Sequence, residues 1–96
     1  MMLVVTYDVD TSTAAGAKRL RKVAKLCERY GMRVQNSVFE VVLDAAQLVQ
    51  LKSQLQGVID VEQDSVRFYR LGNSYLGKIE TMGKQPLVQA GGPLML

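Results

Sequence analysis

Two aspartates lie close together near the start of the sequence, in the segment Tyr7-Asp8-Val9-Asp10. They follow a run of apolar residues that predicts a strand, and a carboxylate at a strand end is held rigidly. Carboxylate oxygens are the usual protein ligands of Mg²⁺, with water and phosphate oxygens completing the shell. The segment is therefore a candidate cation site, with its aspartates, Asp8 among them, as the possible metal ligands. In the alternative, Asp10 only starts a turn and Asp8 only assists the cap of the following helix.

Positive charge is concentrated in the segment that comes next. Seven lysines and arginines, against the single acid Glu28, fall between positions 18 and 33, although the whole chain carries only +3. Such a surface suits the phosphate backbone of a nucleic acid, and the alternative is an ordinary solvated helix face. The candidate nucleic-acid-binding residues here are Lys18, Arg19, Arg21, Lys22, Lys25 and Arg33.

The residue inventory excludes several classes of site. The chain has no histidine, which rules out a Ser-His-Asp triad, an HExxH zinc site and any imidazole proton shuttle. Its one cysteine, Cys27, can neither close an intrachain disulfide nor hold a zinc ion alone, and a reducing cytoplasm fits it best. Hydrolysis of a phosphodiester with the help of a divalent cation is the chemistry that remains.

The apolar pattern predicts an α+β fold with the order strand, helix, strand, strand, helix, strand. Each helix has cap signals, with threonine and serine before the first and Asp44 with Gln47 before the second, and Gly31 and Gly57 are expected to close them. Asn36 and Ser37 predict a turn between the middle strands. This order is typical of the ferredoxin-like βαββαβ sandwich. The expected elements are strands within 2–9, 32–43 (two) and 64–71, and helices 13–30 and 45–56.

The 96 residues are enough for one domain, and we expect it over 1–72, followed by a tail over 73–96. The tail holds both prolines and two short apolar stretches, Tyr75 to Ile79 and Leu87 to Val88, which we expect to form short strands on a sheet edge. The sheet would keep one apolar face uncovered, so a two-fold homodimer is expected, with Asp8 of each copy near the axis. The start of the chain predicts neither a signal peptide nor a membrane span.

A second cluster surrounds the predicted turn between the two middle strands. Arg33, Ser37 and Phe39 lie there, with polar side chains between apolar ones, and they are candidate nucleic-acid-binding residues. Taken singly, Ser37 can be a plain turn residue and Phe39 a plain core residue.

These segments together resemble one family. The motifs are MLVVTYDVD, the basic helix, RVQNSVFE (Arg33 to Glu40) and DSVRFYRLG (Asp64 to Gly72), and they span nearly the whole chain. The sequence is similar to the Cas2 family, the small CRISPR-associated endonucleases of spacer acquisition, and in particular to members from I-C type systems.

The resemblance implies a ferredoxin-like homodimer whose tail strand crosses to the partner's sheet. It implies a Mg²⁺ or Mn²⁺ ion between two copies of Asp8, with Asp8 and Tyr7 as catalytic residues that hydrolyse RNA or double-stranded DNA. The alternative that it implies is a non-catalytic subunit that bridges integrase dimers on DNA.

Overall fold

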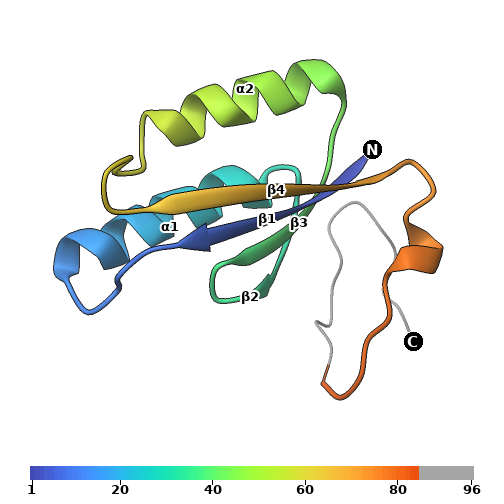
Figure 1. Ribbon diagram of the computed structural model, residues 1–96, viewed down its shortest axis with the longest axis horizontal. Helices are drawn as coiled ribbons and strands as arrows, with labels where there is room; N and C mark the ends of the chain where they lie inside the picture. Colours follow the sequence, from blue (N-terminus) through green and yellow to red (C-terminus); the bar gives the residue numbers. More distant parts are fainter. Residues whose placement is uncertain (85–96) are drawn as a thin grey trace.

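The computed structural model describes residues 1–84 and shows two layers, a four-stranded antiparallel sheet with two helices on one of its faces (Figure 1). The strand order is β2-β3-β1-β4, which confirms the predicted ferredoxin-like α+β arrangement. The elements are β1 (Met2–Asp8), α1 (Ala14–Glu28), β2 (Gly31–Gln35), β3 (Val38–Val42), α2 (Ala45–Gln56), β4 (Ser65–Gly72) and the short 3-10 helix η1 (Leu76–Lys78).

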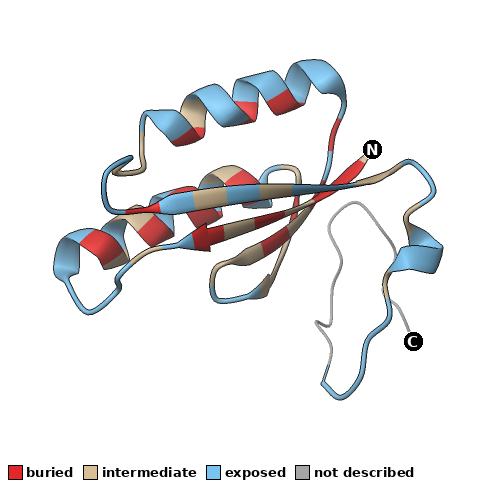
Figure 2. Ribbon diagram, viewed as in Figure 1, coloured by how far each residue is buried: buried red, intermediate tan, exposed pale blue. Residues whose placement is uncertain are grey.

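Alternation along β1 separates the two faces of the sheet. Leu3, Val5 and Tyr7 are buried against the helices, whereas Val4 and Thr6 between them are only half-buried. The buried residues of α1 and α2 pack on the same face, as Figure 2 shows by the buried stripes on the inner sides of both helices. One hydrophobic core therefore lies between the sheet and the helices.

The helix caps explain where both helices begin. The Thr13 side chain accepts a hydrogen bond from the Gly16 amide, and Asp44 with Gln47 forms the predicted capping box. Gly57 closes α2 as expected. The prediction that Gly31 closes α1 is wrong, because α1 ends at the cap residue Arg29 and Gly31 is the first residue of β2.

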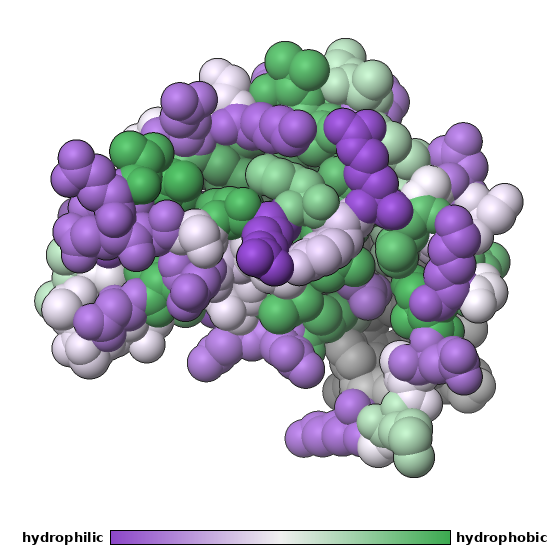
Figure 3. Space-filling model, viewed as in Figure 1, coloured by the Kyte–Doolittle hydropathy of each residue, from purple (hydrophilic) through white to green (hydrophobic). Residues whose placement is uncertain are grey.

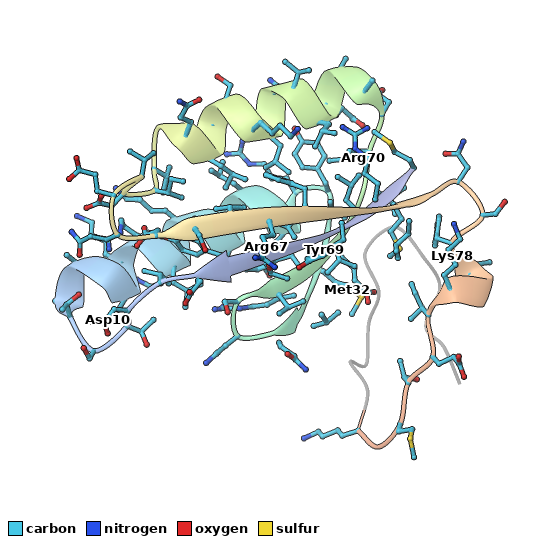
Figure 4. All side chains as sticks on the ribbon, viewed as in Figure 1. Asp10, Met32, Arg67, Tyr69, Arg70 and Lys78 are labelled. Atoms are coloured by element: carbon cyan, nitrogen blue, oxygen red, sulfur yellow. The ribbon has the colours of Figure 1, made fainter. Side chains whose placement is uncertain are left out.

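The other face of the sheet carries no helix in the described part of the chain. The register places Met32, Glu40, Val4 and Tyr69 in one row across the four strands, and Val38, Thr6 and Arg67 in the next. Figure 4 shows Met32, Arg67 and Tyr69 on the side away from α2, while Arg70 lies on the α2 side. We call this surface the open sheet face.

The beginning of the tail differs from the prediction. Tyr75 to Ile79 was expected to form a short strand, but it contains η1, and the Lys78 amide donates to the Tyr75 carbonyl. The second stretch, Leu87 to Val88, lies outside the described residues. Residues 73–84 leave the sheet at the end opposite Asp10 (Figures 1 and 4). Pairing of the tail with a partner's sheet stays a prediction.

None of the helices within residues 1–84 has the length and the apolar character needed to span a membrane.

Candidate metal and nucleic-acid site

Asp8 is the last residue of β1 and its side chain is exposed. It pairs across the sheet with Ser65, the first residue of β4, and it shares the open sheet face with Val4 and Thr6. Among residues 1–84, no hydrogen bond or ion pair engages its carboxylate. Asp8 therefore presents free oxygen donors at one end of the open sheet face.

Asp10 has a different role, the local one that the sequence left open. One of its carboxylate oxygens accepts hydrogen bonds from the Ser12 amide at 2.9 Å and the Ser12 hydroxyl at 2.6 Å. These two bonds hold the pKa of Asp10 below its ordinary value. Asp10 thus shapes the turn that leads from β1 into α1, at the far left of Figure 4.

Tyr7 points to the opposite side from Asp8, into the core. Its hydroxyl donates to Asp64 at 2.5 Å, and Arg19 donates to the same carboxylate through Nε at 2.8 Å and Nη2 at 3.1 Å. Burial, together with the bond to Asp64, raises the pKa of Tyr7 to about 12. Burial acts to raise the pKa of Asp64, but its hydrogen bonds to Arg19 and Tyr7 outweigh burial and leave that pKa lowered.

This arrangement revises the expectations for two predicted residues. The Tyr7 hydroxyl is buried and its proton is directed at Asp64, so it cannot reach a substrate in this structure. Arg19 was expected to contact nucleic acid, but its guanidinium is held by a buried carboxylate and its side chain is only 18% exposed. Both side chains serve the interior of the domain.

The remaining basic residues of α1 form one exposed row. The buried residues Leu20, Val23, Ala24 and Cys27 occupy one side of the helix. At 3.6 residues per turn the row lies on the opposite side of the helix, and the sheet lies between it and the open sheet face. The row consists of Lys18, Arg21, Lys22, Lys25 and Arg29.

The basic row of α1 and Asp8 thus lie near the same end of the molecule, but on opposite faces of it. β1 runs toward the end where α1 begins (Figure 1), and hydrophilic side chains cover that end on the left of Figure 3. The sequence placed the basic residues beside the aspartates. In the structure, a bound strand would have to pass around this end to contact both.

The cluster at the β2–β3 turn is assembled only in part. Arg33 Nε donates to the Asn36 carbonyl at 2.7 Å, and its guanidinium carbon lies 5.8 Å from the centre of the Phe39 ring. Phe39 is fully buried, so its ring cannot face nucleic acid in this structure and it belongs to the core. Ser37 is half-buried, and its carbonyl accepts the Tyr7 amide at 2.9 Å. Of these three candidates, only Arg33 and Ser37 are partly exposed.

A single chain supplies few ligands for a metal ion. Residues 1–84 contain no group of three or more histidine, cysteine, aspartate or glutamate side chains placed to share an ion. Asp8 offers oxygen donors of the kind that Mg²⁺ and Mn²⁺ take, whereas Asp10 is engaged by Ser12. One chain thus supplies a single suitable carboxylate at this place, and a second copy would supply another from its own Asp8.

Comparison with known proteins identifies the family. The family model described as CRISPR associated protein Cas2 matches residues 1–79. The chain belongs to the Cas2 family. Among its Cas2 relatives is the CRISPR-associated endonuclease Cas2 of Halalkalibacterium halodurans, 54% identical over 95 residues and covered to 99% in both chains. The CRISPR-associated endoribonuclease Cas2 3 of Rhodospirillum rubrum is 50% identical, over 99% of this chain and 100% of the relative.

A solved Cas2 structure agrees with the fold. The crystal structure of Streptococcus pyogenes Cas2 superposes with a TM-score of 0.82 at 55% identity, over 86% of this chain and 100% of that one. The family expected from the motifs is therefore confirmed, and the names of the Cas2 relatives confirm the predicted class, a CRISPR-associated endonuclease.

Asp64 is the residue of this region that the sequence did not single out, because the apolar pattern indicates only the start of a strand there. Its partners Tyr7 and Arg19 are 57 and 45 residues away along the chain. The one available signal was an acid placed immediately before an apolar strand, because an acid at a buried position needs a partner.

Proposed function

We propose that the protein acts as a homodimeric, Mg²⁺- or Mn²⁺-dependent endonuclease of the CRISPR adaptation machinery, which hydrolyses phosphodiester bonds of RNA or double-stranded DNA. The observation that carries the proposal is the free carboxylate of Asp8 at the end of the open sheet face. The names of the relatives add the reaction class. The free thiol of Cys27 is buried, which suits a cytoplasmic location.

The open sheet face supports the homodimer. Val4, Val38 and Met32 are half-buried on this face, and Val42 and Tyr69 are 45% and 47% exposed. Glu40 in the same row is half-buried, and this burial raises the pKa of its carboxyl. A second copy placed face to face would cover this surface with an identical one.

Two copies would also complete the cation site. Asp8 points to the open sheet face, so a two-fold axis through that face near the end of β1 brings both carboxylates together. The two Asp8 carboxylates would hold the cation, which when bound would lower the pKa of a water molecule and stabilise charge on the scissile phosphate. In the reaction, water adds to phosphorus, one P–O ester bond breaks, and a phosphate monoester and a hydroxyl group result.

The basic row would hold the backbone of the nucleic acid. Lys18, Arg21, Lys22 and Lys25 are exposed cations that can contact phosphates without reading sequence, and Arg33 is a further candidate at the β2–β3 turn. Such contacts suit both RNA and DNA, so either can be the substrate.

The position of the row also favours a second candidate function. In a dimer joined through the open sheet faces, the two rows would lie on opposite outer surfaces, where they could bind DNA and bridge the subunits of an integrase without any cleavage. In this non-catalytic role, Asp8 would serve packing of the dimer.

Replacing Asp8 by asparagine separates the two candidates. Asp8→Asn keeps the shape of the side chain and removes its charge, so we expect loss of Mg²⁺-dependent cleavage of RNA and duplex DNA, with binding of the duplex retained. Asp10→Asn is the matched control, because its carboxylate is engaged in the turn, and it should cleave nearly as the wild type does. Unchanged cleavage by purified Asp8→Asn would favour the bridging role.

A further inference from the structure

The carboxylate of Asp64 collects four hydrogen bonds from three parts of the chain. It accepts from the Tyr7 hydroxyl on β1, from Nε and Nη2 of Arg19 on α1, and from the Asp60 amide at 3.0 Å in the loop before β4. Its side chain is fully buried. A buried carboxylate with this many donors is held rigidly, because loss of any donor would leave polar atoms unpaired in the interior.

This buried carboxylate lies beside the end of β1, which carries Asp8, and beside the start of β4, which pairs with it. Tyr7 is the residue before Asp8, and Asp64 is the residue before Ser65, the cross-strand partner of Asp8. The Tyr7 amide also donates to the Ser37 carbonyl at 2.9 Å, which holds β1 against the β2–β3 turn. The backbone of Asp8 is therefore held through its neighbour in sequence and through its neighbour across the sheet.

The chain beyond Asp8 is confined as well. A Cβ atom placed on Gly16 would lie 1.8 Å from the Asp10 carbonyl oxygen, so the first turn of α1 sits directly against the backbone of Asp10. The Asp8 carboxylate itself has no partner within residues 1–84. Its position depends on the backbone on either side.

We propose that Asp64, Tyr7 and Arg19 form a clamp of positioning residues that sets the place of the Asp8 carboxylate for cation binding. This inference rests on the proposed function. Ligand groups must be held to within about 0.5 Å, and supporting residues outside the ligand shell change metal affinity or activity by about 10- to 100-fold. The clamp supplies that support from the core side of the sheet, behind the strand end that carries Asp8.

The clamp differs from a role of Tyr7 in the chemistry itself. The phenol is 2% exposed and its hydroxyl is bonded to Asp64, so Tyr7 acts without contact to the substrate. Removing the hydroxyl should scale the cleavage rate at every pH and leave the shape of the pH profile unchanged. A proton-transfer role would change that shape.

Tyr7→Phe tests the clamp, because it removes one hydroxyl and keeps the ring in the core. In the full-length protein we expect Mn²⁺ affinity, measured by electron paramagnetic resonance titration, to fall about tenfold, and cleavage to fall at least as much. Asp64→Asn keeps the shape of the carboxylate and should act in the same direction. Two controls are included. Tyr30→Phe also removes a phenol oxygen, but near the C-terminal end of α1, and Leu51→Val lowers the stability of the core under α2 without touching the clamp. Neither control should change Mn²⁺ affinity.

The outcomes are distinguishable. The clamp is overturned if folded Tyr7→Phe binds Mn²⁺ as tightly as the wild type does. It is also overturned if Tyr7→Phe loses no more Mn²⁺ affinity than Leu51→Val, a variant of equal melting temperature. In either case Asp8→Asn would still abolish binding. If Asp64→Asn does not fold, Tyr7→Phe decides alone. Wild-type Mn²⁺ binding and cleavage in Asp8→Asn would overturn the proposed function and the clamp together.

Discussion

Tyr7 and Asp8 are adjacent in sequence and have opposite environments. One side chain is sealed in the core and the other is open to solvent, because successive residues of a strand point to opposite faces. The family resemblance implied that the two residues form a catalytic pair. The structure gives them separate tasks, with Asp8 available to a cation and Tyr7 bonded to Asp64.

The neutral form of the Tyr7 phenol contributes stability that alkaline solution should remove. Its pKa is raised from 10.0 to about 12, so the contribution is complete below pH 10 and is lost as pH rises through about 12. We expect the free energy of unfolding to fall by about 2 kcal/mol over that range because of Tyr7. Urea unfolding of Tyr7→Phe at a series of pH values should show a correspondingly shallower decline.

Cys27 requires a control in that experiment. Burial raises the pKa of its thiol from 9.0 to about 12, which gives a second alkaline loss of the same sign. The comparison is therefore made in a Cys27→Ala background. Equal pH dependence with and without the Tyr7 hydroxyl in that background would contradict the buried state of the phenol.

At the scale of the elements, the start of α1 depends on close contact with the turn after β1. Gly16→Ala would place a Cβ atom 1.8 Å from the Asp10 carbonyl oxygen, so the turn or the helix must shift. We expect a loss of about 1 to 3 kcal/mol in the free energy of unfolding, as for other overpacked sites. Gly77→Ala is the control, because nothing lies within 4 Å of a Cβ there. A fully stable Gly16→Ala protein would argue against this contact.

The outer side of α1 gives a prediction for nucleic-acid binding. Lys22 and Lys25 are exposed in the basic row, and each phosphate contact releases about one counterion. For the double variant Lys22→Ala with Lys25→Ala, the slope of log K against log salt on duplex DNA should fall by about two units. A slope equal to that of the wild type would mean that the row is an ordinary solvated surface.

The elements could be predicted where local signals were complete. The bounds of α2 were predicted correctly, because Asp44 and Gln47 form the cap and Gly57 ends the helix. The end of α1 could not be predicted correctly, because Gly31 does not cap the helix but is required for strand packing. A Cβ on Gly31 would lie 1.8 Å from the Glu40 carbonyl oxygen, so the glycine allows β2 to approach β3, a contact between residues nine apart in the chain.

The candidate site was predicted less completely than the fold. Asp8 could be singled out because its strand has a local signal, because a face-to-face dimer would pair its two copies, and because the family resemblance points to the aspartate after Tyr7. The ion pair of Arg19 with Asp64 and the burial of Phe39 depend on which distant segments meet, and residue type and spacing do not contain that information. The sequence also does not show to which side of the sheet each side chain points. The basic row on α1 is close to Asp8 in sequence, but it lies on the opposite side of the sheet in the structure.

At the scale of the whole molecule, the proposed cation site needs a second copy of the chain. At the end of β1, one chain offers a cation only the carboxylate of Asp8, because residues 1–84 hold no group of three or more potential ligands. The described part of the chain also leaves the open sheet face without a helix. Both features are explained by one two-fold contact, which covers the apolar rows around Val4 and brings the two Asp8 side chains together.

The most direct test is the stoichiometry of Mn²⁺ binding measured by isothermal titration calorimetry, with the molecular mass determined on the same samples. The account predicts about one Mn²⁺ per two chains in the wild type. Binding should be lost in Asp8→Asn, which stays dimeric, and in Val4→Lys, whose lysine in the open sheet face keeps the chain monomeric. One Mn²⁺ bound by each chain, or binding that persists in either variant, would contradict a cation site shared between two copies of Asp8.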